Sequence, residues 1–214
     1  MLPNPVAYLI HRNGSLPAIP AGKAFAYVLA GNGLFKRARN RHVDALIPLA
    51  TSQVAGLQPL TPYVHPLAGH IPGQILHRIL HDARRRSWNG PREAMYHVTV
   101  ENNRVRVFRP PQQAGAANLA YTGGDDPNIV LDLHSHQEMD AFYSSTDNRD
   151  EQGFRFYAVI GRIFTRPEII LRLGMYGDFY RLPVTTLFTD LGAFQEWSHT
   201  KVEEKSSRNQ LGVI

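Results

Sequence analysis

Two histidines and an aspartate at short spacings are the residues of this chain most capable of chemistry. His134 and His136 are separated by one serine, and after seven further residues Ser144 and Asp147 form a Ser-x-x-Asp sequence. Two imidazoles and a carboxylate supply three zinc ligands and leave the fourth position to water, which is typical of catalytic rather than structural zinc sites. Zinc lowers the pKa of such a water to about 7. The spacing therefore predicts a zinc-dependent hydrolase with His134, His136 and Asp147 as metal ligands.

The segments that carry these residues are expected to bring them together. Residues 128–133 are rich in apolar and β-branched residues, which predicts a buried strand. Alternate side chains of a strand point the same way, so His134 and His136 can reach one ion from its end. Residues 144–152 are polar and begin with a serine suited to an N-cap, which predicts a short helix with Asp147 in its first turn. A lone His-x-His or Ser-x-x-Asp is usually a surface pair or a helix cap, but their combination after an apolar strand favours metal binding.

This motif resembles the JAMM motif of the MPN-domain metalloproteases, also called MPN+ or JAB proteins. The resemblance covers residues 93–147 at the level of the motif and residues 66–188 at the level of the fold. It implies an α+β fold with an MPN/JAB-like (cytidine-deaminase-like) mixed β-sheet flanked by helices. It also implies Zn²⁺ as cofactor and an (iso)peptidase that cleaves amide bonds after the C-terminal tail of a ubiquitin-like protein.

The same resemblance implies roles for two further residues. In JAMM proteins a glutamate upstream of the histidines is the general base. Glu93 fits because it lies 41 residues before His134, between an expected helix and an expected strand. Glu101 is the competing carboxylate, but it adjoins an expected turn and is interpreted as an exposed charge at a strand end. Ser144 would help to hold the tetrahedral oxyanion.

The chain departs from the family pattern at the position after the second histidine. Gln137 stands where the family commonly has proline, which affects the substrate groove and not the metal ligands. Together with the chain length and an added N-terminal lobe, this makes the chain similar to the bacterial family called PRTRC system protein A. That resemblance implies a ubiquitin-like conjugation pathway with a ThiF-like (E1-like) activating enzyme as a pathway partner.

The expected elements divide the chain into a β-rich lobe of unknown role at 1–65, the zinc hydrolase domain at 66–200 and a polar tail at 201–214. Apolar residues at helical spacing predict a helix from about 71 to 86. Strands are expected at 6–10, 24–30, 45–50, 94–100, 104–108, 154–160 and 168–173, with a long loop at 110–127.

Composition limits the class of protein. The 214-residue chain has 43% hydrophobic residues, enough for a sizeable core, and no cysteine. The lack of cysteine excludes disulfide and thiolate chemistry and fits a cytoplasmic protein. No apolar run approaches the ~20 residues that span a bilayer, and residues 1–5 do not begin a secretory signal, so no membrane partner is expected.

The net charge of +5 leaves a nucleic-acid interpretation open. The arginines at 84–86 fall at the end of the expected helix, where cations offset the macrodipole. The basic cluster at 36–41 could instead bind phosphate or an acidic partner. A basic nucleic-acid-associated protein of a plasmid or mobile-element system is therefore one alternative function.

A non-catalytic MPN-type binding scaffold is the other alternative, and an intact Glu93 argues against it because a scaffold needs no base. A second metal site is a further hypothesis, because His77 and His81 lie four residues apart on one face of the expected helix. No third ligand is near them in the sequence, so both are interpreted as half-exposed helix residues.

Overall fold

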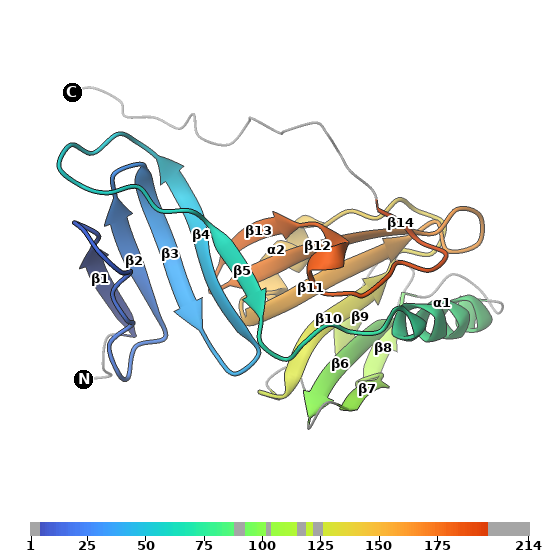
Figure 1. The fold of residues 1–214 in the computed structure, drawn as a ribbon. Helices are drawn as coiled ribbons and strands as arrows, with labels where there is room; N and C mark the ends of the chain where they lie inside the picture. Colours follow the sequence, from blue (N-terminus) through green and yellow to red (C-terminus); the bar gives the residue numbers. More distant parts are fainter. Residues whose placement is uncertain (1–4, 88–92, 102–103, 115–118, 122–125, 197–214) are drawn as a thin grey trace, which may run out of the picture.

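The computed structural model describes residues 5–87, 93–101, 104–114, 119–121 and 126–196. Within these residues the chain is mostly β, with two mixed sheets, one small hairpin sheet and two α-helices (Figure 1). The longer helix is α1 (Gly73–Ser87), and α2 (Ser145–Asp150) has only six residues. The mixed sheet and the β-rich N-terminal lobe agree with expectation, but the described residues contain less helix than a sheet flanked by helices implies. The expected tail at 201–214 lies outside the described residues.

No helix in the described part of the chain is both long and apolar enough to cross a membrane.

The N-terminal sheet is built from five strands in chain order. They are β1 (Val6–Ile10), β2 (Phe25–Ala30), β3 (Gly33–Arg39), β4 (Val43–Thr51) and β5 (Tyr63–Pro66). β1 pairs with β2 in parallel, and the remaining neighbours are antiparallel. Buried and half-buried residues alternate along β2, as expected where only one face of a sheet is well covered.

The larger sheet has the strand order β13-β12-β11-β10-β6-β7, and β14 also pairs with β12. Its strands are β6 (Met95–Glu101), β7 (Arg104–Phe108), β10 (Ile129–Ser135), β11 (Phe154–Gly161), β12 (Glu168–Met175), β13 (Asp178–Leu182) and β14 (Gln195–Glu196). β10 and β11 are parallel neighbours, which requires a crossover connection, and this crossover contains α2. The topology thus brings α2 back from the end of β10.

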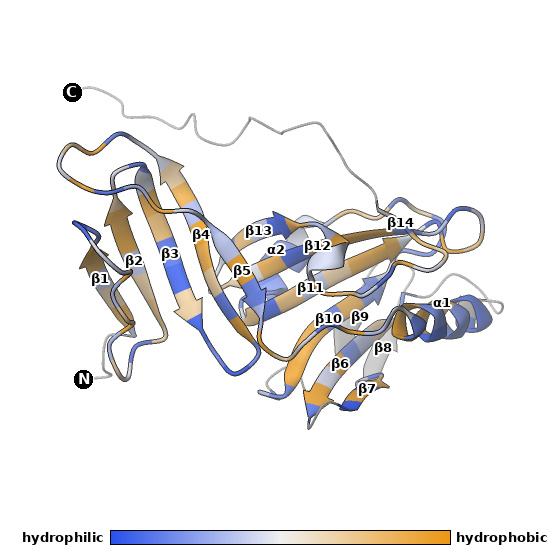
Figure 2. Ribbon diagram, viewed as in Figure 1, coloured by the Kyte–Doolittle hydropathy of each residue, from blue (hydrophilic) through white to orange (hydrophobic). Residues whose placement is uncertain are grey.

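Side chains of β10 alternate between two environments. Leu131 and Leu133 are buried in the main core, together with the apolar face of α1 and with Ile47 from the N-terminal sheet. Asp132 and His134 point to the opposite face, which α2 and the segment before it approach. Figure 2 shows hydrophobic colour along the strands and a largely hydrophilic outer surface on α1, as expected for an amphipathic helix.

Several parts of the structure differ from the elements expected from the sequence, and the short strands β5 and β14 are among them. β3 and β13 were not expected, because charged and aromatic residues obscure their alternation. The loop expected at 110–127 contains two short antiparallel strands, β8 (Gln112–Ala114) and β9 (Leu119–Tyr121). A 3₁₀ turn at Val184–Thr186 follows β13.

A buried lysine joins the two large sheets. Lys36 of β3 is 1% exposed, and its Nζ donates to the Tyr176 carbonyl (2.9 Å) and to the Asp178 carboxylate (2.8 Å). The same Nζ lies 4.2 Å from the centre of the Phe25 ring, a cation–π contact. The loop after β3 adds a hydrogen bond from Asn40 Nδ2 to the Phe154 carbonyl (3.1 Å). These contacts hold the N-terminal lobe against the start of β11 and β13.

Candidate metal centre

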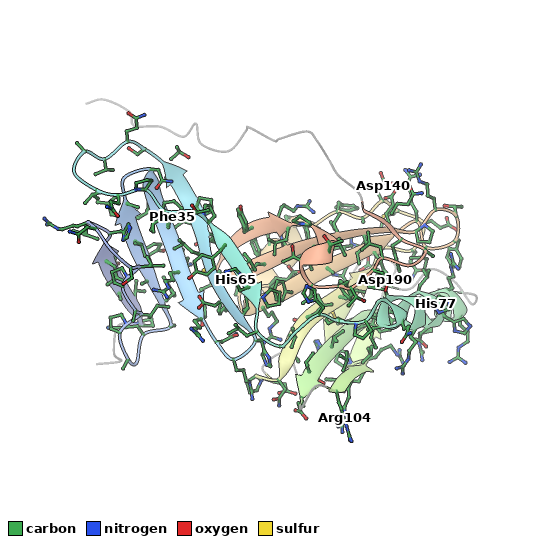
Figure 3. All side chains as sticks on the ribbon, viewed as in Figure 1. Phe35, His65, His77, Arg104, Asp140 and Asp190 are labelled. Atoms are coloured by element: carbon green, nitrogen blue, oxygen red, sulfur yellow. The ribbon has the colours of Figure 1, made fainter. Side chains whose placement is uncertain are left out.

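The two histidines lie at the end of β10 with their Nε2 atoms facing each other. Both side chains are buried, and the Nε2 atoms of His134 and His136 are 3.1 Å apart. The His136 ring is held in place by a hydrogen bond, because its Nδ1 lies 3.2 Å from the carbonyl oxygen of Asp140, which is labelled in Figure 3. A proton on Nδ1 leaves the Nε2 lone pair free for a metal, which is the usual second contact of a metal-binding histidine.

The third candidate ligand comes from the first turn of α2. Ser144 caps this helix: its Oγ accepts from the Asp147 N–H (3.1 Å), and its own N–H donates to Asp147 Oδ2 (2.6 Å). The other carboxylate oxygen, Oδ1, lies 3.6 Å from His134 Nε2. The Ser-x-x-Asp sequence is therefore a reciprocal capping box, and the cap orients Asp147 towards the imidazoles.

The distances between these donor atoms fit a zinc ion. Ligands at about 2.0–2.2 Å from a tetrahedral zinc are roughly 3.3–3.6 Å from one another. The two measured pairs span 3.1 and 3.6 Å, and all three ligand atoms lie within 4.8 Å of one another. His134, His136 and Asp147 would hold the ion. No other group of three such residues is found in the ranges that the structure describes.

Burial keeps both imidazoles neutral at neutral pH. Loss of solvation lowers the pKa of His134 to about 4, a shift that the negative charge of Asp147 opposes. Burial also lowers the pKa of His136, against the opposing effect of the Asp140 carbonyl. Only neutral imidazole binds a metal, so both side chains are ready for coordination without first losing a proton.

Glu93 enters the site from the segment before β6. Met95 is paired with His134, and the next pair outward is joined by two hydrogen bonds of 3.1 Å, one from the Ser135 N–H to the Ala94 carbonyl and one from the Ala94 N–H to Ser135 Oγ. Extending this register by one residue places Glu93 beside His136, on the face that carries the ligands.

The pKa of the Glu93 carboxyl suits a general base that acts at neutral pH. Burial and the nearby negative charge of Asp147 raise its pKa to about 7. The competing carboxylate, Glu101, is exposed and lies opposite Arg104 at the far end of β6. Glu101 lies six residues along the strand from Met95, the residue paired with His134, which corresponds to roughly 20 Å at the rise per residue of a strand. Of the two carboxylates, only Glu93 is near the candidate metal ligands.

Ser144 lies at the start of α2 beside the ligand that it caps. Its Oγ accepts the Asp147 N–H and keeps its own hydroxyl proton for another acceptor. Ser144 can therefore cap the helix and still donate a hydrogen bond to an oxyanion, the role that the family resemblance implies.

A buried arginine that the sequence analysis did not identify holds the rest of α2. None of the α2 side chains is buried, so the helix has no apolar anchor. Arg172 of β12 donates from Nε to Glu151 Oε2 (2.9 Å) and from Nη1 to Asn148 Oδ1 (2.6 Å). Its guanidinium lies 3.7 Å from the ring centres of both Tyr143 and Phe179. The only sequence signal was a charged residue in the interior of a strand that is apolar apart from Glu168 at its start.

The turn after His136 explains the departure from the JAMM pattern. Gln137 has a φ of 58°, in the left-handed region, and its carbonyl accepts from the Ile163 N–H (2.8 Å). Proline is restricted to a φ near −65° and cannot adopt this conformation. The glutamine therefore belongs to a turn geometry that a proline at this position would not allow.

The basic cluster at 36–41 is largely engaged in contacts within the chain. Lys36 is buried at the junction of the sheets, and Arg37 Nη1 donates to the Pro17 carbonyl. Arg39 lies 3.2 Å from Asp44, and Arg41 Nε donates to the Pro127 carbonyl (3.2 Å). Each of these four cations therefore already has a partner within the chain.

The paired histidines of α1 do not form part of a metal site in the described residues. His77 and His81 are exposed, and Figure 3 shows the labelled His77 on the outer side of the helix. Within the described ranges, no third metal-binding side chain groups with them.

A scan of the chain against models of known protein families finds no match, and a search of curated proteins finds none either. The JAMM resemblance therefore depends on the motif residues and on their arrangement in space. That arrangement consists of three ligand side chains from β10 and α2 and one carboxyl from the segment before β6.

Proposed function

We propose that this chain is a JAMM-type zinc metallopeptidase that cleaves an amide bond after the C-terminal tail of a ubiquitin-like protein. The observation that carries the proposal is the convergence of three separate segments on one point. His134 and His136 lie at the end of β10, Asp147 lies in α2, and the Glu93 carboxyl with its raised pKa belongs to the segment before β6. Such a set of perturbed titratable groups with metal-ligand spacing is the expected composition of a hydrolytic zinc site.

The residues divide the chemical work as follows. Zinc, when bound, would supply the positive charge that polarises a water molecule and the substrate carbonyl. Glu93 accepts a proton from the attacking water and returns it to the leaving amine, a transfer for which a pKa of about 7 is well matched. Ser144 donates a hydrogen bond from its hydroxyl to the oxyanion that forms as the carbonyl is attacked.

The order of elements also supports an MPN-like arrangement. A helix (α1), a hairpin (β6 and β7), the metal-binding strand (β10), a short helix (α2) and a further strand (β11) follow one another, as the resemblance implies. The ubiquitin-like substrate and a ThiF-like pathway partner rest on that resemblance alone.

The test combines metal analysis with one substitution. We expect the purified protein to bind about one zinc ion and to cleave linear fusions of a ubiquitin-like protein with a reporter peptide, and a chelator should abolish this cleavage. Glu93→Gln should keep the zinc and lower kcat by about 10² to 10⁴-fold, the range for loss of a general base. Unchanged cleavage by Glu93→Gln would refute the assignment of the base, and absence of zinc would refute the metallopeptidase.

The two alternative functions make different predictions. A non-catalytic scaffold should bind zinc and cleave no fusion, and Glu93→Gln should then change neither property. A nucleic-acid-associated protein should show steeply salt-dependent DNA binding that is lost when Arg37, Arg39 and Arg41 are replaced. The burial of Lys36 and the internal partners of these arginines make this second alternative less favourable.

A further inference from the structure

β7 is the last strand of the large sheet. Among the described residues β7 pairs only with β6. An edge strand carries a row of backbone N–H and C=O groups that can pair with one more strand. Arg104, Arg106 and Phe108 are exposed along β7, and Figure 3 shows the labelled Arg104 at its end, pointing away from the molecule.

A cavity opens beside this edge. Its volume is about 280 Å³, and it lies between α1 and β7, on the side of the sheet opposite the metal centre. It is lined by Arg78, Ile79, Asp82, Tyr96, Val107, Phe108 and Arg109. Apolar atoms of Ile79 and Val107 offer a surface for an apolar side chain, and the two arginines add positive charge.

The charges around the cavity are strongly unbalanced. Asp82 accepts from Arg86 Nε (2.9 Å) and from the Tyr96 hydroxyl (3.1 Å), and it lies 3.5 Å from Arg109 Nε and 3.8 Å from Arg85 Nη2. One carboxylate therefore serves three guanidinium groups, each with five N–H donors.

Among the described residues, three further arginines lie near the cavity or along β7 and make no ion pair with Asp82. Arg78 lines the cavity, and Arg104 and Arg106 lie along β7. The only other carboxylate on α1, β6 or β7 is Glu101, which is opposite Arg104. Arg78 and Arg109 line the cavity on one side of β7, with Arg85 and Arg86 on the same helix as Arg78. Arg104 and Arg106 alternate with Val105 and Val107 and therefore face the other side of the sheet. We call these six arginines, on the two sides of the edge strand β7, the basic edge.

We propose that the basic edge is a docking site for an extended acidic segment of a partner protein. The segment would add a strand to β7, place an apolar side chain in the cavity and set its carboxylates against the arginines. A row of backbone groups pairs with a peptide strand and has no counterpart in a nucleic-acid duplex. The same arginines repel a second copy of this edge, so they favour an acidic strand over self-association.

The probes are three fluorescein-labelled hexapeptides that alternate Glu with Val, Glu with Ala, and Lys with Val. Fluorescence anisotropy at low and at physiological salt measures their binding to the full-length protein. We expect the Glu-Val peptide to bind most tightly and to weaken with added salt, because exposed charges are screened. The Glu-Ala peptide should bind more weakly, and the Lys-Val peptide should not bind.

Charge-reversal variants locate the site. Arg106→Glu and Arg78→Glu should each weaken Glu-Val binding by about tenfold or more, as expected when attraction at an interface becomes repulsion. Arg12→Glu is the matched control, because Arg12 is an exposed arginine of the N-terminal lobe. Slower amide hydrogen exchange in β7 on addition of the peptide would identify the strand itself.

Three results would overturn the proposal. They are equal binding of the Glu-Val and Lys-Val peptides, equal binding by the two variants and the wild type, and tight binding of a short DNA duplex with none of the acidic peptide. None of these readouts involves zinc, so the proposal stands or fails separately from the metallopeptidase.

Discussion

The raised pKa of Glu93, beside the proposed zinc ligands, makes the stability of the metal-free protein depend on pH. Burial and the charge of Asp147 raise the pKa of Glu93 to about 7, whereas an unfolded glutamate titrates near its ordinary value of 4.5. Between these two pH values the folded protein holds a proton that the unfolded chain has lost. The ionised form of Glu93 therefore opposes folding, and its effect grows as pH rises from about 4.5 to 7.

Glu93→Gln should raise the melting temperature of the metal-free protein at pH 8 and change it little near pH 4.5. The glutamine is uncharged at every pH, so it removes a penalty that exists only where Glu93 is ionised. Thermal unfolding in the presence of a chelator measures the difference, and the exposed Glu101→Gln is the control that should show none. An equal effect of Glu93→Gln at both pH values would mean that Glu93 is not held near Asp147.

The turn at Gln137 is a second feature at the scale of one residue. Gln137→Pro should lower the free energy of unfolding by about 3 kcal/mol or more, because proline cannot adopt a φ of 58°. Gln137→Gly should be tolerated, because glycine adopts positive φ without strain. Denaturant unfolding of the two variants tests this, and a stable Gln137→Pro protein would show that the turn can take the conformation expected from the JAMM pattern.

At the scale of elements, the position of Asp147 depends on how α2 is held. The capping box fixes the first turn of the helix, and Arg172 fixes Asn148 and Glu151 towards its end. Because no α2 side chain is buried, the helix has no apolar contact that could replace these polar ones. Arg172 is therefore expected to be a positioning residue for the metal centre.

Arg172→Met should lower the stability by about 3–5 kcal/mol, because it leaves the buried Glu151 carboxylate without its partner. The double variant Arg172→Met with Glu151→Gln should recover much of this stability, since no buried charge remains. Both variants should nevertheless bind zinc at least about tenfold more weakly than the wild type, because α2 is no longer held. Isothermal titration with zinc and thermal unfolding separate the two effects. Full recovery of zinc affinity in the double variant would show that the capping box alone positions Asp147.

At the scale of the whole molecule, the two large sheets share one core. Ala45 and Ile47 of β4 belong to the same buried cluster as α1 and the strands of the larger sheet. Lys36 adds a buried polar contact to this apolar junction. We therefore expect the two lobes to unfold together.

Calorimetry should detect one transition whose van't Hoff and calorimetric enthalpies agree. Lys36→Met should lower the stability by about 1–3 kcal/mol and leave the transition single. Its partner Asp178 keeps 39% of its side-chain exposure, so the carboxylate left behind remains partly solvated. Two resolved transitions in the wild type would contradict a shared core.

Much of the larger domain could be predicted from local pattern. The apolar run before His134, the helical spacing of Ile75 and Ile79, and the alternation in β6 and β7 all gave elements that the structure contains. These patterns are strong because each element buries one continuous face against the same core. β3 was missed because a charged residue such as Lys36 is usually exposed to solvent. Only the partners of Lys36 on the other lobe make the burial of its side chain favourable.

The amino-acid sequence by itself determined the candidate zinc ligands, because residue type decides which atoms can bind zinc and the two-residue period of a strand places two histidines on one side. Its capping motif also determined that Asp147 begins a helix. Only the tertiary structure decided that this helix returns to the end of β10, that Glu93 lies beside the ligands with a raised pKa, and that Arg172 holds α2 in place. The physical reason is range: capping and strand alternation act over a few residues, whereas burial, ion pairing and strand register depend on segments far apart in the chain.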